Sequence, residues 1–283
     1  MPSSFGTAPI QKGENMTKIL GVDFSHWQSK VDFSKLVAND IQFAIFKAGE
    51  IPTTSKKEYW DDMYERNIRE AKEHSIISGA YYYWHPSIGA SRQARHFIAI
   101  MDIYGKPDLP PVIDAEDTDG GMHPVDIAKQ MKAFSDYLEN AGYRKPIIYS
   151  RWGWLVNQAG FTKLPSADWY KDHYLWLAQY NDKLIYKPAD MSKVIMWQYT
   201  DRLKLPGIGV GLDGNYWLKS AQELYDLADV DAQSEVEPED PFHSAQYREK
   251  YLLFKRKDER SLMDYFYWKW VKGRERTQYG VEK

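Results

Sequence analysis

The segment that most constrains the fold of this chain is a short apolar run that follows two prolines and ends in acidic residues. It covers residues 110–117, Pro-Pro-Val-Ile-Asp-Ala-Glu-Asp. Such a run predicts a buried β-strand whose acidic end emerges at the edge of a sheet. Because alternate side chains of a strand share a face, Asp114 and Glu116 are predicted to point to the same side. Two carboxyl groups facing one cleft suit glycosidic bond cleavage, which needs one proton donor and one ionised partner.

Acidic residues also end two other predicted strands, at Asp23 after Gly-Val and at Asp213 after Gly-Leu. A single Asp-x-Glu sequence is more often a strand end that merely meets water. Four carboxylates at equivalent ends of different strands are harder to explain by packing alone. A barrel of parallel strands, in contrast, collects its catalytic residues at the C-terminal ends of the strands. The pattern therefore predicts that Asp23, Asp114, Glu116 and Asp213 share one cleft.

Strand and helix patterns alternate along the first half of the chain and then change. Strands are predicted near residues 19–23, 43–48, 79–84, 110–116, 146–149, 174–179, 194–199 and 211–213, and helices at 59–74, 91–104 and 124–142. The gaps between the last three strands carry Pro, Gly and Asp and lack helical periodicity, although a parallel crossover normally needs a helix. We therefore predict an α/β fold, an irregular TIM-like (β/α)5β3 barrel with a C-terminal extension.

Composition places the chain among globular proteins. It has 283 residues, 43% of them hydrophobic, and an aromatic content of 15% that suits a core and also a sugar-binding groove. The net charge of −3 gives no support for nucleic acid as a partner. No cysteine is present, which excludes disulfides and thiolate metal sites. No apolar segment approaches the roughly 18 residues of a membrane span, so no membrane insertion is expected.

The two ends of the chain differ from the predicted barrel at residues 18–228. Residues 1–17 are predicted to be a flexible leader, and Met16 is a candidate start site. Residues 229–241 hold six acids, no bases and two prolines, which predicts a solvated linker. Residues 242–283 carry 11 Lys plus Arg, 6 Asp plus Glu and ten aromatic residues. They are predicted to form a small module for wall binding, self-association or docking, or else a helix packed on the barrel.

Seven segments, in this order along residues 18–225, resemble the motif set of the glycoside hydrolase family 25 lysozymes, which are muramidases of phages, bacteria and fungi. The segments are residues 23–28, 43–50, 79–81, 114–116, 177–180, 196–199 and 213–215. The resemblance implies cleavage of the β-1,4 bond between N-acetylmuramic acid and N-acetylglucosamine in peptidoglycan. It also implies that Glu116 is the general acid, that Asp114 is its partner carboxylate, and that Asp23 and Asp213 are the other acids of the cleft.

The expected electrostatics follow from this pairing. Burial and the charge of Asp114 should raise the pKa of Glu116, while Asp114 should stay ionised. Asp114 could attack the sugar carbon, activate water, or steady an N-acetyl group that attacks from within the substrate, and we favour the last. The sequence departs from the family pattern at Tyr82, where a His is common, and at Gly49, before Glu50. These departures concern the sugar-binding subsites and leave the four acids unchanged.

Five further residues are candidates for substrate binding. Tyr81, Tyr149 and Trp197 could stack on sugar rings, but aromatic residues in barrel strands are equally often part of the core. Lys47 and Gln179 lie near predicted strand exits and could orient acetamido or hydroxyl groups, or could simply pair with a cleft acid.

No metal ligands and no cofactor are predicted. The seven His are scattered without a His-x-x-x-His pair. Asp117, Asp119, Gly120 and Gly121 resemble a cation-binding loop only faintly, and they are interpreted as a turn.

Two other function classes remain open from the sequence. One is a non-catalytic glycan-binding or virion structural protein that retains a lysozyme-like barrel. The other is a chitinase-like enzyme, although Val112 and Ile113 do not supply the longer D-x-x-D-x-D-x-E ladder of that family. The favoured setting is a phage or prophage endolysin acting on peptidoglycan glycan strands. Because no signal peptide is recognised, the protein is expected in the host cytoplasm before release to the cell wall, or on a virion.

Overall fold

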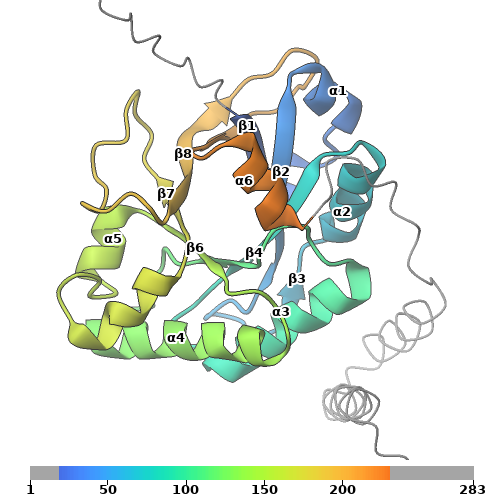
Figure 1. The fold of residues 1–283 in the computed structure, drawn as a ribbon. Coiled ribbons are helices and arrows are strands. Elements are labelled where there is room, and N and C mark those ends of the chain that lie inside the picture. The colour runs from blue at the N-terminus through green and yellow to red at the C-terminus, as the bar shows by residue number, and fades with distance from the viewer. Residues whose placement is uncertain (1–18, 230–283) are drawn as a thin grey trace, which may run out of the picture.

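The computed structural model describes residues 19–229, which form a closed barrel surrounded by helices (Figure 1). Eight strands follow one another around the barrel in the order β1-β9-β8-β7-β6-β5-β4-β2, and pairing of β1 with β2 closes it. The predicted α/β barrel of (β/α)5β3 type is confirmed. The predicted leader, the C-terminal module at 242–283 and all but the first residue of the predicted linker lie outside the described residues.

Each of the eight predicted strands is present, but the last one runs from Leu212 to Trp217, so Asp213 lies near its start and not at its end as predicted. In chain order the barrel strands are β1 (Ile19–Phe24), β2 (Ile41–Glu50), β4 (Ile77–Tyr83), β5 (Val112–Asp114), β6 (Ile147–Ser150), β7 (Leu175–Ala178), β8 (Val194–Leu203) and β9 (Leu212–Trp217). A two-residue strand, β3 (Tyr59–Trp60), pairs with the end of β2 and was not predicted.

Strand direction explains why the last part of the barrel needs little helix. The pairs from β1–β2 round to β7–β8 are parallel, whereas β9 is antiparallel to both β8 and β1. Antiparallel neighbours can be joined by a short turn, so the connection from β8 to β9 requires no crossover helix. Only the β7–β8 connection is a parallel crossover without a helix, and residues 179–193 span it as a loop.

The helices lie outside the barrel and after its last strand. They are α1 (Phe33–Ala38), α2 (Tyr64–Glu73), α3 (Ala90–Tyr104), α4 (Pro124–Asn140), α5 (Trp152–Asn157) and α6 (Ala221–Ala228), with 3-10 helices at His26–Gln28 and Pro165–Asp172. The sequence predicted α2, α3 and α4. It placed the start of α2 at residue 59, because it did not separate β3 from the helix. The helices α1, α5 and α6 are too short for a clear 3.6-residue period.

Helix α4 shows how the sequence sets a helix and its buried face. Pro124 occupies its first turn, where a proline removes no intrahelical hydrogen bond, and the His123 side chain caps the Val125 amide. Met131 and Phe134 are fully buried on the face toward the barrel. Burying one such side chain contributes roughly 1.5–3 kcal/mol, so replacing Phe134 with Ala would disrupt this packing most directly.

Two apolar layers hold the barrel together. One lies between the strands and the outer helices, and the other fills the barrel interior with residues such as Phe43, Ile45 and Trp176. The interior is crowded: a Cβ atom at Gly21 would lie 2.2 Å from the Phe43 ring. Glycine at position 21 of β1 is therefore what lets the neighbouring strand place Phe43 inside the barrel.

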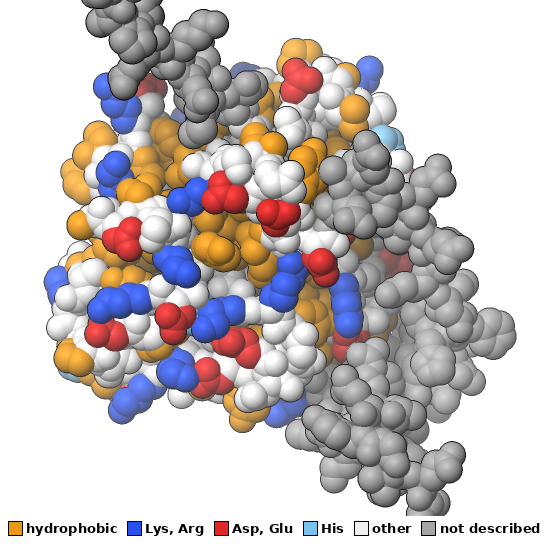
Figure 2. All heavy atoms as spheres, viewed as in Figure 1, with side chains coloured by type: hydrophobic (Ala, Val, Ile, Leu, Met, Phe, Trp, Pro, Cys, Tyr) orange, Lys and Arg blue, Asp and Glu red, His pale blue; other side chains and the backbone are white. Residues whose placement is uncertain are grey.

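Helix α6 covers the end of the barrel at which the parallel strands begin, and it crosses in front of the strands in Figure 1. Its buried residues Leu224 and Ala228 join the interior cluster beside Ile19 and Ile77 at strand starts. On this face acidic and basic side chains of the described residues are interspersed (Figure 2). Within residues 19–229, no helix combines the length and apolar character needed to cross a bilayer. With this end closed, the interior is accessible from the opposite end.

Candidate active site

Two hollows mark the two ends of the barrel. The hollow of about 330 Å³ beside α6 is lined by strand starts such as Ile41 and Ile77, and Asp40 is its one carboxylate. The hollow of about 240 Å³ at the opposite end has four carboxylates in its wall. We call this second hollow the acidic pocket. Its lining residues are Asp23, Ser25, Trp27, Lys47, Tyr81, Tyr83, Asp114, Glu116, Tyr149, Trp176, Tyr180, Gln198 and Asp213.

Strand β5 and the residues after it deliver the Asp-x-Glu pair. The strand ends at Asp114, and the buried Ala115 then bonds through its amide to the Tyr149 carbonyl of β6. The Ser150 hydroxyl donates to the Ala115 carbonyl from the other side. These bonds fix the backbone between the two acids, so both side chains reach the acidic pocket as the alternation predicted.

The two acids differ in burial and in partners. The Asp114 residue is 6% exposed, and its Oδ1 is buried without a hydrogen-bonding partner among the described residues. The Glu116 side chain is more open at 28% exposed, and the Arg151 Nε lies 3.8 Å from its Oε1. A buried carboxylate oxygen without a donor is costly, so this arrangement is not explained by packing.

Burial raises the pKa of Glu116 and the Arg151 charge opposes the rise, so the predicted direction is confirmed, but the predicted contribution of the Asp114 charge is not among its causes. The surroundings of Asp114 work against the expectation that it stays ionised. Burial first, and the nearby Glu116 second, raise the pKa of Asp114 well above its usual range, although Lys47 opposes them. The sequence did not reveal that Asp114 would be the deeper of the two.

The other two acids face each other across a pair of strands. Asp23 of β1 is the register partner of Asp213 of β9. Asp23 Oδ2 accepts hydrogen bonds from Gln198 Nε2 at 2.9 Å and Asn215 Nδ2 at 2.7 Å. Burial and Asp213 still raise the pKa of Asp23 well above its usual range, and burial raises the pKa of Asp213 to about 6. Two such close carboxyl groups favour holding one proton between them.

Aromatic side chains brace this pair. The hydroxyls of Tyr149 and Tyr180 both donate to Gln198 Oε1, at 2.8 and 3.0 Å. The Trp176 indole donates to Asn215 Oδ1 at 2.9 Å, and its ring lies 4.4 Å from that of Tyr149 between centroids. The two amides that serve Asp23 are therefore themselves oriented by aromatic donors, which makes the network rigid.

Three of the five predicted substrate-binding residues line the acidic pocket: Tyr81, Tyr149 and Lys47. Lys47 binds Glu50 through Nζ at 2.7 Å and lies 5.3 Å from the centre of the Tyr83 ring. Lys47 therefore faces the pocket while it pairs with an acid outside the pocket lining, and its role toward a substrate stays a prediction.

Gln179 and Trp197 are not among the lining residues, which corrects their predicted placement. The Gln179 side chain bonds to the Lys183 carbonyl and the Tyr186 amide, and so shapes the loop after β7. The Trp197 indole donates to the Gln179 carbonyl at 2.8 Å. On β8 successive side chains alternate, so the neighbour of Trp197 that enters the pocket is Gln198.

Several lining residues were not singled out from the sequence, among them Ser25, Trp27, Trp176, Tyr180 and Gln198. Strand alternation was a usable signal for Gln198, because Gln198 and its neighbour Trp197 must point to opposite sides of β8. In the structure, the register partner of Gln198 on β9 is Asn215. Trp27 and Tyr180 lie within the motif segments 23–28 and 177–180, which were a usable signal, but neither residue was given a role. Their exposed fractions are 79% and 52%.

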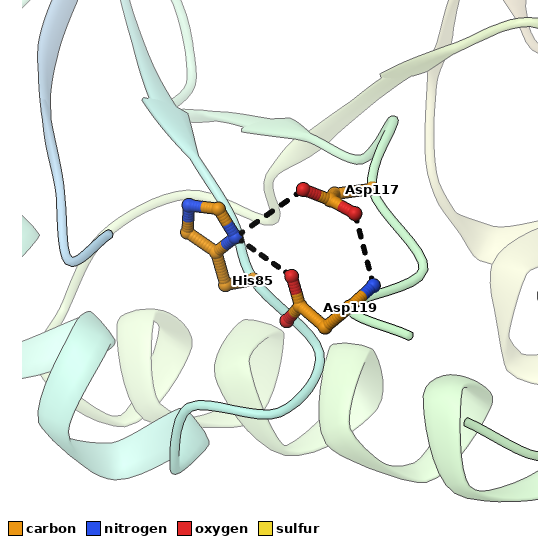
Figure 3. A group of neighbouring side chains, drawn as sticks. All are labelled: His85, Asp117 and Asp119. Carbon is orange, nitrogen blue, oxygen red and sulfur yellow. Dashed lines mark hydrogen bonds and ion pairs between the residues drawn. The ribbon is translucent and has the colours of Figure 1, made fainter. Parts of the chain in front are cut away.

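A second group of polar side chains lies next to the pocket, outside its lining. His85, from the loop after β4, points toward Asp117 and Asp119, from the loop after β5 (Figure 3). One ligand atom of each lies within 4.8 Å of the others, so these three residues could hold a metal ion. Asp119, Gly120 and Gly121 have positive φ angles, as a tight turn requires, but the sequence interpretation of a turn alone missed His85.

Several of the motif segments contribute residues to the acidic pocket. Comparison with known proteins identifies the family to which these motifs belong. The model of the family "Glycosyl hydrolases family 25" matches residues 22–208. The chain belongs to glycosyl hydrolase family 25. It is therefore a glycoside hydrolase of the lysozyme and muramidase class.

Relatives of this family 25 chain span several bacteria. The uncharacterized protein YegX of Escherichia coli K12 is 31% identical over 218 residues, which cover 75% of this chain and 74% of YegX. Lysozyme M1 of Streptomyces globisporus is 26% identical over 74% of this chain and 71% of its own length. The structure of a family 25 glycosyl hydrolase from Bacillus anthracis is similar with a TM-score of 0.62 and 26% identity, covering 74% of this chain and 93% of that one.

The two sequence departures have structural explanations. Tyr82 is fully buried, and its hydroxyl lies 3.0 Å from Nδ1 of His96 on α3. It therefore points away from the acidic pocket. A Cβ at Gly49 would lie 2.4 Å from the Tyr59 carbonyl, so glycine allows β3 to approach β2 closely. Neither position contributes to the lining of the pocket.

Proposed function

We propose that this chain hydrolyses the β-1,4 bond between N-acetylmuramic acid and N-acetylglucosamine in peptidoglycan, with Glu116 as the general acid. The observation that carries the proposal is the convergence of Asp23, Asp114, Glu116 and Asp213 in one aromatic-walled pocket. The first three lie at or just after the C-terminal ends of parallel strands, and Asp213 comes from the start of the antiparallel β9. Membership of family 25 supports the bond type.

Glu116 is the better proton donor because it combines a raised pKa with access. Its carboxyl group is partly open, so it can reach the leaving glycosidic oxygen, and burial keeps it protonated at higher pH than an ordinary Glu. Asp114 is too deeply buried to reach an exposed leaving group in the same way.

Asp114 is proposed to hold the acetamido group of the substrate. Its buried Oδ1 has no donor in the described residues, and a substrate N–H would supply one. Held in this way, the acetamido oxygen can attack the sugar carbon as the bond to the leaving oxygen breaks and Glu116 delivers its proton. Burial raises the pKa of Asp114, and the Lys47 charge opposes this rise and so favours the ionised form that accepts the hydrogen bond.

Analysis of new reducing ends in digested peptidoglycan tests the proposal. Purified walls are incubated with the full chain and, as matched control, with Glu116→Gln. Muramic acid at the new reducing ends, formed only by the unsubstituted chain, is the expected result. Glucosamine at the reducing ends would contradict the bond assignment, and no new reducing ends would favour a non-catalytic glycan-binding protein.

A phage or prophage endolysin is the proposed setting, with the protein in the host cytoplasm before release or carried on a virion. The basic, aromatic composition of residues 242–283 supports a role in wall attachment, self-association or virion docking. Binding of Glu116→Gln to purified walls, compared with the same variant ending at residue 241, tests the wall-attachment role. Equal binding by both forms would leave self-association or docking, which sedimentation of the full chain can detect.

A further inference from the structure

We propose that His85, Asp117 and Asp119 form a binding site for one divalent first-row transition-metal ion of the Zn²⁺ or Mn²⁺ type. The site joins the loop after β4 to the loop after β5. None of its three residues lines the acidic pocket, so the inference stands apart from the proposed function.

The spacing of the three ligand atoms is close to that of a coordination sphere. His85 Nδ1 lies 3.0 Å from Asp119 Oδ1 and 3.7 Å from Asp117 Oδ2. Ligand atoms about 2.0–2.2 Å from one ion lie roughly 3–3.5 Å from each other. All three ligand atoms lie within 4.8 Å of one another, so rotation of the side chains drawn in Figure 3 could bring them around one ion.

Groups outside the three residues aim the ligand atoms inward. Glu50 Oε2 lies 3.3 Å from His85 Nε2, which leaves Nδ1 to face the site. Asp119 Oδ2 accepts hydrogen bonds from both the amide and the hydroxyl of Ser87 at 2.8 Å, which leaves Oδ1 for the site. A carboxylate on the far nitrogen of a histidine is the usual outer partner of a metal-bound imidazole.

The charges of the group call for a cation. Glu50 is already paired with Lys47 at 2.7 Å. For Asp117 and Asp119, the one ion-pair partner within residues 19–229 is the same His85 nitrogen, and no Lys or Arg serves either of them. A doubly charged ion would neutralise both carboxylates at once, which a single imidazole nitrogen cannot do.

The donor set selects the class of metal. One imidazole nitrogen with two carboxylate oxygens suits first-row transition ions better than Mg²⁺ or Ca²⁺, which prefer oxygen ligands throughout. The Asp117 side chain is 39% exposed, so water can complete the coordination from that side. The site is thus open to solvent on one side and firmly oriented on the other.

Direct titration of the full chain tests the site. After chelator treatment, and with no affinity tag, the protein is titrated calorimetrically with ZnCl₂ and separately with MnCl₂. One ion per chain is expected, with affinity weakened at least about 10-fold in Asp117→Asn and about 100-fold in His85→Gln. At a metal concentration near 100 times Kd, the melting temperature should rise by roughly 5 °C or more.

Two further variants make the test selective. Glu50→Gln should weaken binding about 10- to 100-fold through the orientation of His85 alone. His26→Gln is the matched control, because it breaks the pair of His26 Nδ1 with Asp61 Oδ2 at 2.6 Å, which is not part of the three-residue group. Binding that is absent, or that is equal in the unsubstituted chain and in both Asp117→Asn and His85→Gln, would overturn the proposal. So would binding lost in His26→Gln but kept in His85→Gln.

Discussion

The acidic pocket holds two pairs of carboxyl groups, Asp23 with Asp213 and Asp114 with Glu116, which differ in the hydrogen-bond donors that reach them. Asp23 accepts hydrogen bonds from the amides of Gln198 and Asn215, which aromatic donors orient in turn, and Asp213 lies beside Asp23 as its register partner. Asp114 has a buried oxygen without a donor. A satisfied pair of buried acids can be part of the scaffold. An unsatisfied pair is costly to keep, and it is the one that a substrate would complete.

The largest expected effect is on the unsatisfied pair. Glu116→Gln should lower the rate of wall lysis by about 10²–10⁴-fold, because it removes a general acid while preserving shape. Turbidity loss of purified walls measures the rate, and the melting temperature should not change. Near-normal lysis would refute the role of Glu116.

Asp114→Asn sharpens the same contrast by separating activity from stability. Its activity should also fall by about 10²–10⁴-fold at neutral pH, whereas its melting temperature should equal or exceed that of the unsubstituted chain. The physical reason is that burial disfavours the ionised Asp114, so removing its charge costs the fold nothing. A clear drop in melting temperature would place Asp114 in the scaffold instead.

The satisfied pair should behave in the opposite way. Asn215→Leu removes a donor to Asp23 and leaves the Trp176 indole without its acceptor. The free energy of unfolding should fall by about 1–3 kcal/mol, which urea denaturation can measure. The exposed Asn181→Leu is the control and should change it by less than about 0.5 kcal/mol. Equal losses in the two variants would remove the special status of the amide network.

The pH dependence of stability provides a smaller test of the satisfied pair. Asp213 has a pKa raised from 3.8 to about 6, so its ionisation opposes folding as pH rises through this range. The gain in melting temperature of Asp213→Asn over the unsubstituted chain should therefore grow from pH 3.8 to pH 6 and then level off. The exposed Asp182→Asn should show no such growth. A gain that shrinks with rising pH would reverse the sign assigned to Asp213.

Tyr180→Phe should have the smallest effect. The Tyr180 hydroxyl donates to Gln198, but Tyr149 donates to the same oxygen, and Tyr180 is half-exposed. Stability should change by less than about 0.5 kcal/mol, and activity by only a few-fold through the pocket wall. Tyr149→Phe, whose hydroxyl is buried, should cost more, about 1 kcal/mol. A larger loss of stability in Tyr180→Phe than in Tyr149→Phe would contradict the view that Tyr149 is the more important donor to Gln198.

The sequence predicted the barrel because apolar strand segments and the acids that follow them are recognisable in the local sequence. Each predicted strand was found, and the alternation at Asp114 and Glu116 placed both in the pocket. On β8 the prediction chose the wrong side of the strand, because Gln198 and not Trp197 faces the pocket. Short helices such as α5 escaped prediction because one or two turns carry too little periodicity.

What the sequence determined by itself is the order of elements and the placing of Asp23, Asp114 and Glu116 at one end, since side-chain alternation is a property of the local chain. Asp213 reaches the same end because β9 runs antiparallel to its neighbours, which only the strand pairing decides. Only the tertiary structure decided how the acids differ. Depth of burial, the donors that reach Asp23 but not Asp114, and the approach of His85 to Asp119 all depend on residues far apart in the sequence. Electrostatic energies depend on such distances and on exclusion of water, which no local pattern records.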